Sequence, residues 1–269
     1  MHSVVTRRID RILASEDGLA SAAAERIVLD AGEVYFQRAF PHVFDANVVR
    51  HPHLEPDQLD GRLDRVRREL VAAGVGHLQL VFDPPPISSR LGVALEQRGF
   101  VRDPLLAMVL TGAPKRVAAP EIEVRAVGPE APFGWYADIL DEMTRHEPWY
   151  SRAVVREIVG SIASKAEAGA LQLFVAVSRG IPLGTAGLAL GHGAARGSAA
   201  IVGIGTRTQM RGRGVAQSMV VALADRARLA GCDLLYLVTR LLDTPQELYR
   251  KMGFGDQFCF DSFLSSRSL

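Results

Sequence analysis

The sequence predicts an α/β protein with mixed sheets, divided into two units. The chain has 269 residues, a length at which two compact units or one large unit is the ordinary expectation. Strand-like and helix-like segments alternate along the second half, joined by short connections that contain Gly and Pro. Thr111–Glu121 has no periodicity and is interrupted by Gly and Pro, so we place a linker at 113–121. The expected units are therefore residues 1–112 and 122–269.

Composition excludes several classes of protein. The chain is 48% hydrophobic, which excludes disorder along its whole length, and its net charge of +1 lacks the basic excess of a dedicated nucleic-acid binder. Apolar runs such as Leu105–Leu110 are far shorter than the roughly 20 residues that a membrane helix needs. The two cysteines, Cys232 and Cys259, suggest neither a disulfide framework nor a structural zinc site. We expect a soluble cytoplasmic protein without a secretory signal, a metal, a nucleic-acid partner or a membrane partner.

The first half holds five expected elements. One of its helices has an apolar stripe that includes Leu59, Leu63, Val66 and Leu70 at helical spacing. The expected helices and strands are helices over Asp10–Ala23, Asp57–Ala73 and Leu91–Gln97, and strands over Leu78–Phe82 and Leu105–Leu110.

The second half is more regular. A long helix ends near Ala230, where Gly231 suits a C-terminal cap, and a later helix has Pro245 at its first turn. The other expected elements are helices over Phe133–Arg145 and Arg152–Ala168, and strands over Ile122–Val127, Leu171–Val177, Leu183–Leu190, Ala199–Gly205, Leu234–Thr239 and Gln257–Phe263.

The two halves share a weak internal repeat. Leu78–Val81 followed by Leu95–Phe100 echoes Leu235–Val238 followed by Leu248–Phe254. In both places a strand precedes a helix that ends in Gly-Phe, and another strand follows. The alternative is a chance recurrence of strand, helix and strand.

A glycine loop lies between an expected strand and the long helix. Gln209–Gly214 reads Gln-Met-Arg-Gly-Arg-Gly, and glycines there let the backbone turn and direct N–H groups into one concavity. The helix N-terminus and the guanidinium groups of Arg211 and Arg213 add positive charge. The loop therefore predicts an anion cradle sized for phosphates. The alternative is an ordinary entry into a helix, with solvated arginines.

Residues from about 122 to 263 resemble the GNAT superfamily of N-acyltransferases. Gln209, Gly212 and Gly214 match its Gln/Arg-x-x-Gly-x-Gly/Ala signature, and Leu248–Phe254 matches its late helix, where a tyrosine precedes Gly-Phe. The resemblance implies that acetyl-CoA, or another acyl-CoA, lies along a splayed strand pair with its pyrophosphate at the glycine loop. The residues implied to bind it are Ile204, Gly205, Thr206, Gln209, Met210, Arg211, Gly212, Arg213, Gly214, Val215, Ala216 and Asp243. The first half resembles a degenerate copy of the same fold, with Leu95 where Tyr249 stands; an unrelated helical cap is the alternative.

Acyl transfer to an amine needs oxyanion donors, a proton for the leaving thiolate and a neutral amine. Backbone N–H groups near Ile204–Thr206 are candidate donors, and the hydroxyl of Tyr249 is the candidate general acid. No base is evident, because Ala199–Gly205 lacks the glutamate that many family members carry on this strand. Candidates for the acceptor site share one segment before the second helix of this half: Glu142, His146, Glu147, Trp149 and Tyr150.

Three functions follow from the resemblance. The first is an N-acetyltransferase that uses acetyl-CoA and a primary amine of a small molecule or peptide, by direct attack in a ternary complex. The second is a non-catalytic acyl-CoA-binding protein with a regulatory or scaffolding role, which the missing glutamate favours. The third is transfer of a longer acyl chain or an aminoacyl group, since a fold does not fix a function.

Overall fold

A computed structural model describes residues 4–115, 119, 121–144, 151–242 and 245–265. The chain forms two compact units, each assembled from separated segments. The larger unit takes its described residues from Met1–Leu19, Met108–Val238 and Thr244–Gln257, and the smaller unit takes the rest. Strands β6 (Leu105–Leu110), β11 (Leu234–Arg240) and β12 (Phe254–Ser265) contribute residues to both units.

The larger unit contains a mixed sheet in the order β11-β10-β9-β8-β7. Only the β10–β11 pair is parallel, and the other neighbours are antiparallel. The strands not yet bounded are β7 (Glu123–Ala126), β8 (Gln172–Ser178), β9 (Ile181–Leu190) and β10 (Ser198–Thr206).

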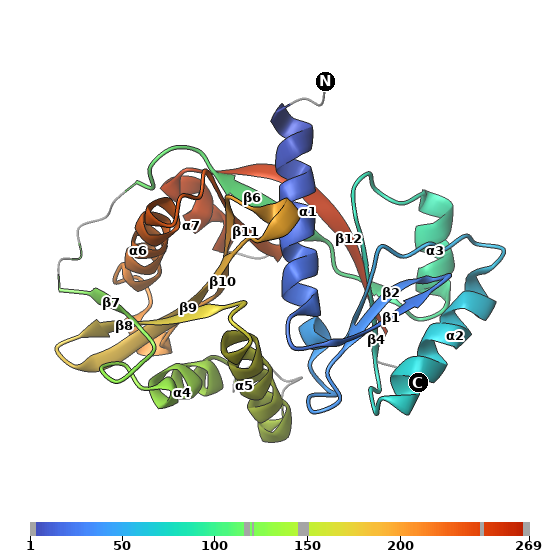
Figure 1. Cartoon of the computed structure of the whole chain (residues 1–269), viewed down its shortest axis with the longest axis horizontal. Coiled ribbons are helices and arrows are strands. Elements are labelled where there is room, and N and C mark those ends of the chain that lie inside the picture. The colour runs from blue at the N-terminus through green and yellow to red at the C-terminus, as the bar shows by residue number, and fades with distance from the viewer. Residues whose placement is uncertain (1–3, 116–118, 120, 145–150, 243–244, 266–269) are drawn as a thin grey trace. The chain divides into compact units, whose positions relative to one another are not determined.

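Helices cover both faces of this sheet. On one side lie α6 (Val215–Leu229) and α7 (Pro245–Met252), and on the other lie α4 (Phe133–Thr144) and α5 (Arg152–Glu167), as Figure 1 shows. Helix α6 has one apolar face, on which Val215, Met219, Leu223 and Ala227 are buried, while Ala230 is exposed beyond the helix end. Gly231 follows with φ +79°, the left-handed conformation expected after a helix.

The first helix of the chain, α1 (Val4–Ser21), packs on the larger unit through polar contacts. The Tyr236 hydroxyl donates to Glu16 Oε1 at 2.8 Å, and Arg11 pairs with Asp233, with 3.3 Å between Nη1 and Oδ2. Residues from the two ends of the sequence therefore stabilise one unit. The helix begins six residues earlier than the sequence predicts.

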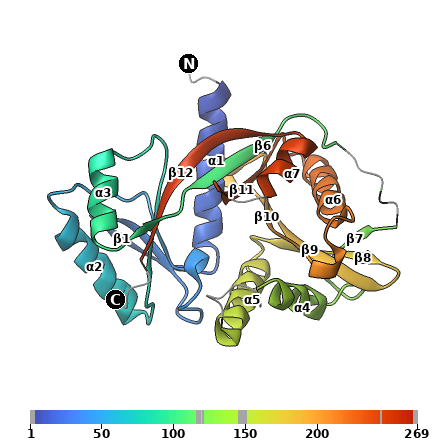
Figure 2. The ribbon, with the colours of Figure 1, turned by 180° about the vertical axis from the view of Figure 1, so that it is seen from behind.

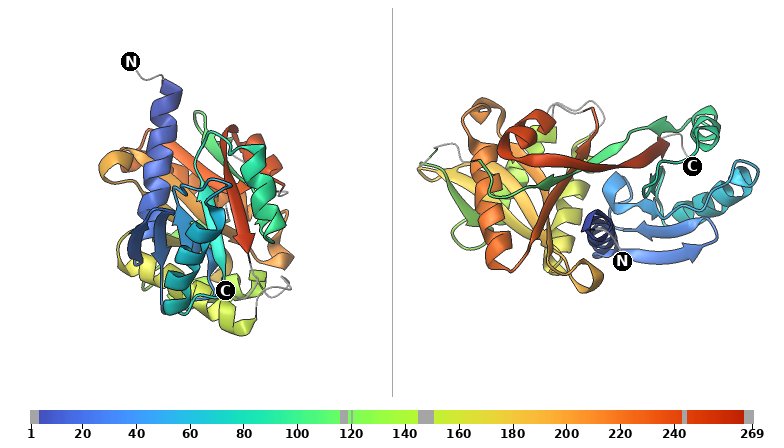
Figure 3. Two further views of the ribbon diagram at one scale, coloured as in Figure 1. Left: turned by 90° about the vertical axis from the view of Figure 1, so that its right-hand side faces the viewer. Right: turned by 90° about the horizontal axis from the view of Figure 1, so that it is seen from above.

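The smaller unit has a sheet in the order β1-β2-β3-β4-β12, with β3 parallel to β4 and the other neighbours antiparallel. Its helices α2 (Leu59–Ala72) and α3 (Ser89–Gln97) lie on the same side of the strands (Figures 1 and 3). Leu63 and Leu70 from α2 and Leu95 from α3 join one hydrophobic core with strand residues such as Leu80. The remaining strands are β1 (Glu25–Leu29), β2 (Gly32–Phe36), β3 (Val48–Arg50), β4 (Leu78–Phe82) and β5 (Val101–Arg102).

The topology confirms the repeat seen in the sequence. In each unit a parallel strand pair is joined through a long helix, and a shorter helix ending in Gly-Phe follows: β3-α2-β4-α3 in the smaller unit and β10-α6-β11-α7 in the larger. An unrelated helical cap is therefore wrong, because the first half has a mixed sheet of its own. The described helices include none long and apolar enough to span a bilayer.

The sequence patterns do not predict β1, β2, β3 and β5. Strand β1 lacks a clean alternation of buried and exposed residues, and Val28 is 65% exposed on it. Strand β3 has three residues, which is too short for any periodicity to show. Its last residue is Arg50, a charged side chain that is buried through contacts made far along the chain.

Candidate functional site

Strands β10 and β11 part at the centre of the larger unit. Their parallel register ends at the pair Ile201 and Leu237, although β10 continues to Thr206. Beyond the pairing, β10 stays bonded to β9 on its other side, through Gly205 opposite Thr185 and Thr206 opposite Gly184. Figure 2 shows β10 and β11 as neighbouring strands, and their pairing ends before residues 202–206 of β10. We call this unpaired place beside β10 the gap, and the backbone groups at this edge of β10 are candidates to bind an extended ligand.

A bulge shapes this end of β10. The register on β9 shifts between Val202 and Gly205, and Gly203 has φ +59°, a conformation that side chains disfavour. Because the bulge turns successive residues out of the regular ladder, the N–H groups near Ile204 are aimed differently from those of a flat strand. Ile204, Gly205 and Thr206, three of the predicted cofactor residues, are thus brought to the gap.

The glycine loop connects this strand end to α6. A short 3-10 turn, Thr208–Met210, includes the first two residues of the loop; Gly212 has φ +75°, and Gly214 has φ +79° immediately before Val215. No side chain caps the helix, whose first internal bond runs from the Ser218 N–H to the Gly214 carbonyl at 2.9 Å.

The amino end of α6 can therefore hold an anion. The N–H groups of its first turn have no carbonyl one turn earlier to bond, and Gly214 itself adds no side chain there. A Cβ atom at Gly214 would lie 3.5 Å from Ala119 Cβ and 3.7 Å from Gln217 Oε1, so these are the neighbouring side chains. The exposed side chains of Arg211 and Arg213 flank the same turn. The other predicted loop residues, Gln209, Met210 and Ala216, lie along this stretch of backbone.

Glu142 fixes the start of this loop. One carboxylate oxygen accepts the Thr208 N–H at 3.0 Å, and the other pairs with the Arg207 guanidinium. Arg207 also donates through Nε to the Pro182 carbonyl at 2.8 Å. The Glu142 carboxylate, predicted as an acceptor-site candidate, therefore braces α4 against the strand end and the loop.

Tyr249 lies on α7, in the same unit. Its side chain is 8% exposed and packs near Phe254, with ring centroids 6.0 Å apart at 59°. The general-acid role of Tyr249 stays a prediction. Five other candidates fall outside the described residues: His146, Glu147, Trp149, Tyr150 and Asp243.

A group of side chains covers the end of β10, and two of them, Met143 and Thr185, are not predicted by the sequence patterns. A Cβ atom at Gly205 would overlap the Met143 sulfur and lie 3.1 Å from Thr185 Oγ1, and one at Gly203 would lie 3.5 Å from the Tyr136 hydroxyl. Tyr136 and Met143 stand seven residues apart on α4, two helical turns, so both face the sheet. That spacing is a sequence signal that connects Met143 with Tyr136.

The smaller unit differs at the corresponding place. Strand β3 stays paired with β4 to its last residue, Arg50, which lies opposite Val81. Arg50 is 4% exposed, its Nη2 lies 3.2 Å from Asp83 Oδ1, and His51 Nδ1 lies 2.5 Å from Asp83 Oδ2. The end of this parallel pair is therefore closed by a charged cluster instead of a gap.

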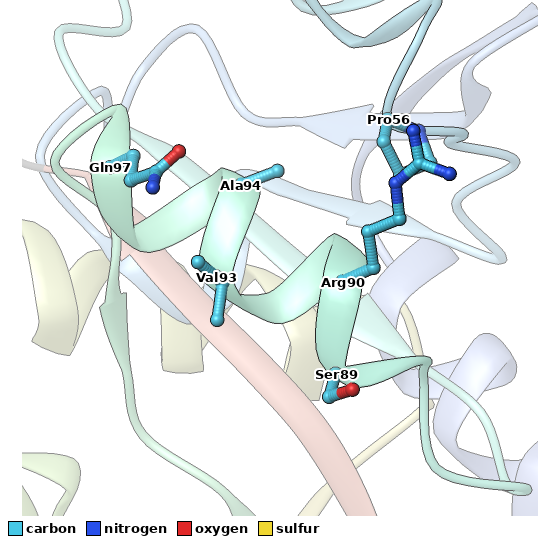
Figure 4. A pocket seen from close by; sticks show the side chains of 6 residues that line it. All are labelled: Pro56, Ser89, Arg90, Val93, Ala94 and Gln97. Carbon is cyan, nitrogen blue, oxygen red and sulfur yellow. The ribbon is translucent and has the colours of Figure 1, made fainter.

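An open hollow of about 400 Å³ lies beside α3 in the smaller unit (Figure 4). Pro56 lines one side, and the other residues lie along α3: Ser89, Arg90, Val93, Ala94 and Gln97. Val93 is 51% exposed there. Ser89, Arg90 and Gln97 are its polar lining residues, and the hollow is open to solvent.

Comparison with known proteins places the fold. The sequence model of the acetyltransferase (GNAT) family matches residues 134–254, and no curated protein matches the chain. A functionally unknown conserved protein from Staphylococcus epidermidis is similar in structure, with 16% identity, TM-score 0.74, and coverage of 92% of this chain and 96% of that one. A GCN5-related N-acetyltransferase from Kribbella flavida has 16% identity, TM-score 0.63 and 95% coverage of both chains. A tandem GNAT protein from the clavulanic acid biosynthesis pathway has 12% identity, TM-score 0.56, and covers 87% of this chain and 77% of that one.

Proposed function

Because residues 134–254 form a domain of the GNAT acetyltransferase family, we propose that the larger unit binds acetyl-CoA, or another acyl-CoA, and transfers its acyl group to a primary amine. The acceptor is an amine of a small molecule or peptide. One observation carries the proposal: a strand with an open edge leads directly into a glycine-capped helix whose first turn has no side-chain cap.

The residues present suit the parts of an acyl-CoA. The N–H groups from Gly212 to Val215 and the positive end of α6 would hold the pyrophosphate, with Arg211 and Arg213 adding charge. The Met210 and Arg211 N–H groups, predicted as further donors, already donate to the Arg207 and Thr208 carbonyls. The amides of the pantetheine arm would bond to the free edge of β10, as an added strand does. The backbone N–H groups near Ile204 would then meet the developing oxyanion.

The proton given to the leaving thiolate and the proton removed from the amine would be handled by different groups. A tyrosine hydroxyl has an ordinary pKa of about 10, so it stays protonated at neutral pH and can donate to a leaving thiolate. Tyr249 is our candidate for this role. We assign Glu142 to positioning the loop, because Arg207 and the Thr208 N–H already occupy its two oxygens. No carboxylate lies on β10, so removal of the amine proton would use a water molecule or the acceptor segment around His146.

The smaller unit would not hold a second acyl-CoA. Its parallel strands stay paired to the end of β3, and Arg50 and Asp83 fill the place of the gap. The connection before α2 contains Pro52 and Pro56, which have no N–H to offer, and the carboxylates of Glu55 and Asp57. The prolines therefore supply no N–H donors to a phosphate, and the two carboxylates repel it. We therefore expect one site per chain.

Titration calorimetry with acetyl-CoA tests the proposal. The wild-type protein should bind one equivalent with micromolar affinity, and Gly212→Glu should lose binding because it places a carboxylate in the anion cradle. Gly231→Glu is a matched control, since Gly231 has φ +79°, close to the +75° of Gly212, and neither has an atom within 4 Å of its Cβ position. Absence of wild-type binding, or equal loss in both variants, would reject the cradle.

A non-catalytic acyl-CoA-binding role is the second candidate. It is favoured by the absence of a carboxylate on β10 and by the engagement of Glu142 with Arg207. The two functions differ in turnover. Release of the CoA thiol across a panel of primary amines supports the enzyme, whereas tight binding with no release above the buffer rate supports the binding role.

A further inference from the structure

The acyl end of the proposed ligand would reach a defined face of the sheet. A Cβ atom at Gly184 would lie 2.7 Å from Val215 Cγ1 and 3.5 Å from Met219 Sδ, so α6 covers one face at the end of β9 and β10. The Cβ direction of Gly205 instead meets Met143 of α4 on the opposite face. A ligand anchored at the start of α6 that threads the gap beside β10 therefore emerges under α4.

Three side chains border the space under α4: Tyr136, Met143 and Thr185. Tyr136 is 1% exposed and is held by Phe133, whose ring is stacked 6.1 Å away at 7°. The Met143 sulfur occupies the volume that a side chain at Gly205 would fill. Thr185 is fully buried, and its hydroxyl has no hydrogen-bond partner among the described residues. The walls are thus one rigid aromatic ring, one flexible thioether and one hydroxyl.

We infer that Met143, backed by Tyr136, closes the acyl pocket and selects a short acyl group, acetyl over butyryl and longer chains. This inference rests on the proposed acyl-CoA site and specifies its substrate class. A longer chain must displace the thioether, because the tyrosine ring is buried and stacks on Phe133. Methionine is flexible, so the selection is graded with chain length and is not absolute.

The wild-type protein should show this selection as affinity. In an open apolar pocket each added methylene strengthens binding about 4-fold, the equivalent of roughly 0.8 kcal/mol. In a closed pocket a longer acyl chain binds more weakly, and we expect the affinity for butyryl-CoA to be about 10-fold lower than the affinity for acetyl-CoA. Calorimetric Kd values for CoA, acetyl-CoA, butyryl-CoA and hexanoyl-CoA give the profile without knowledge of the acceptor, with free CoA as the reference.

Shortening the side chain tests the assignment. Met143→Ala should bring the Kd of butyryl-CoA to or below that of acetyl-CoA, with the Kd of CoA unchanged. Met219→Ala is the matched control: it removes the same atoms from the opposite face of the sheet, so the wild-type order of chain lengths should remain. Should Met143→Ala fail to fold, Met143→Val shortens the side chain with a smaller cavity and should shift the order in the same direction.

The outcomes separate the two proposals. If the wild-type protein binds neither CoA nor acetyl-CoA, the proposed function fails. If it binds both, but tolerates butyryl-CoA as well as acetyl-CoA, or keeps its chain-length order in a folded Met143→Ala or Met143→Val variant, the acyl-CoA site stands and the assignment of Met143 is overturned.

Discussion

His77 makes the smaller unit sensitive to mild acid. Its ring is 5% exposed and packs edge-on against Phe44, with centroids 4.4 Å apart at 72°. Nε2 is buried without a hydrogen-bond partner in the described part of the chain. Burial lowers the pKa of His77 from its ordinary 6.5 to about 4; a bond to the Asn47 backbone opposes this shift, and the nearby His42 adds to it. The folded unit therefore keeps this imidazole neutral.

The sign and size of the effect follow from that pKa. Below pH 6.5 the unfolded chain binds a proton that the folded unit rejects, so the free energy of unfolding falls as the pH decreases. The contribution is complete above about pH 6.5 and is lost by about pH 4. A shift of about 2.5 pH units corresponds to at most about 3 kcal/mol. That is a large share of the roughly 5–15 kcal/mol that stabilises an ordinary domain.

Hydrogen exchange measured between pH 7 and pH 4 checks this effect locally. The amides of α2 and β4 report opening of the smaller unit, and comparison with His77→Phe at each pH cancels the intrinsic exchange rates. The wild-type advantage in protection should shrink by about 100-fold over this range, as about 3 kcal/mol requires. His42→Gln, a change at an exposed histidine, should retain most of the pH dependence. Parallel loss of protection in the wild-type protein and His77→Phe would refute the reasoning.

Three further predictions concern the larger unit. Tyr249→Phe should lower kcat about 100-fold or more while the Kd of acetyl-CoA stays within about 2-fold, because only proton donation is lost. The rate of CoA thiol release measures kcat, and an unchanged kcat would remove Tyr249 from the mechanism. Glu142→Gln should reduce the free energy of unfolding by no more than about 1 kcal/mol, because Glu142 and Arg207 are both partly exposed. The same change should weaken acetyl-CoA binding several-fold, because the loop is held less firmly. If calorimetry finds an unchanged Kd, Glu142 does not position the loop for binding. Gly205→Ala should lower the free energy of unfolding by about 1–3 kcal/mol, because the added methyl group overlaps Met143. The Tm should fall by several degrees, and an unchanged Tm would show that α4 shifts without cost to accommodate the methyl group.

Much of the fold could be predicted from local patterns. The bounds of β4 and β6 match the prediction residue for residue, because both are short apolar runs limited by charged or turn-forming residues. Helix α7 begins at Pro245 as expected, since the missing N–H of proline is not needed at a helix start. The GNAT fold and the repeated unit follow from the glycine loop and from Gly253-Phe254, and the comparisons confirm both.

The remainder depends on contacts that sequence patterns do not contain. The residues around Arg50 do not predict that it is buried at the end of a strand, because its burial depends on Asp83, thirty-three residues later. The gap beside β10 is a property of register, visible only when Ile201 and Leu237 are found to be the last partners. No local pattern distinguishes Met143 from the other residues of its helix, because its contact with Gly205 arises only when α4 packs on the sheet.

The way the chain is shared between the units limits how this protein can be divided. Residues 4–19 serve the larger unit from the start of the sequence, while residues 258–265 of β12 complete the sheet of the smaller unit from the other end. A fragment that begins at 122 would carry the whole glycine loop yet lack the helix that bonds Tyr236 and Asp233. A fragment that stops at 112 would leave β4 with an unpaired edge. Gene fusions, truncation screens and evolutionary exchange of halves must therefore preserve both ends of the chain together.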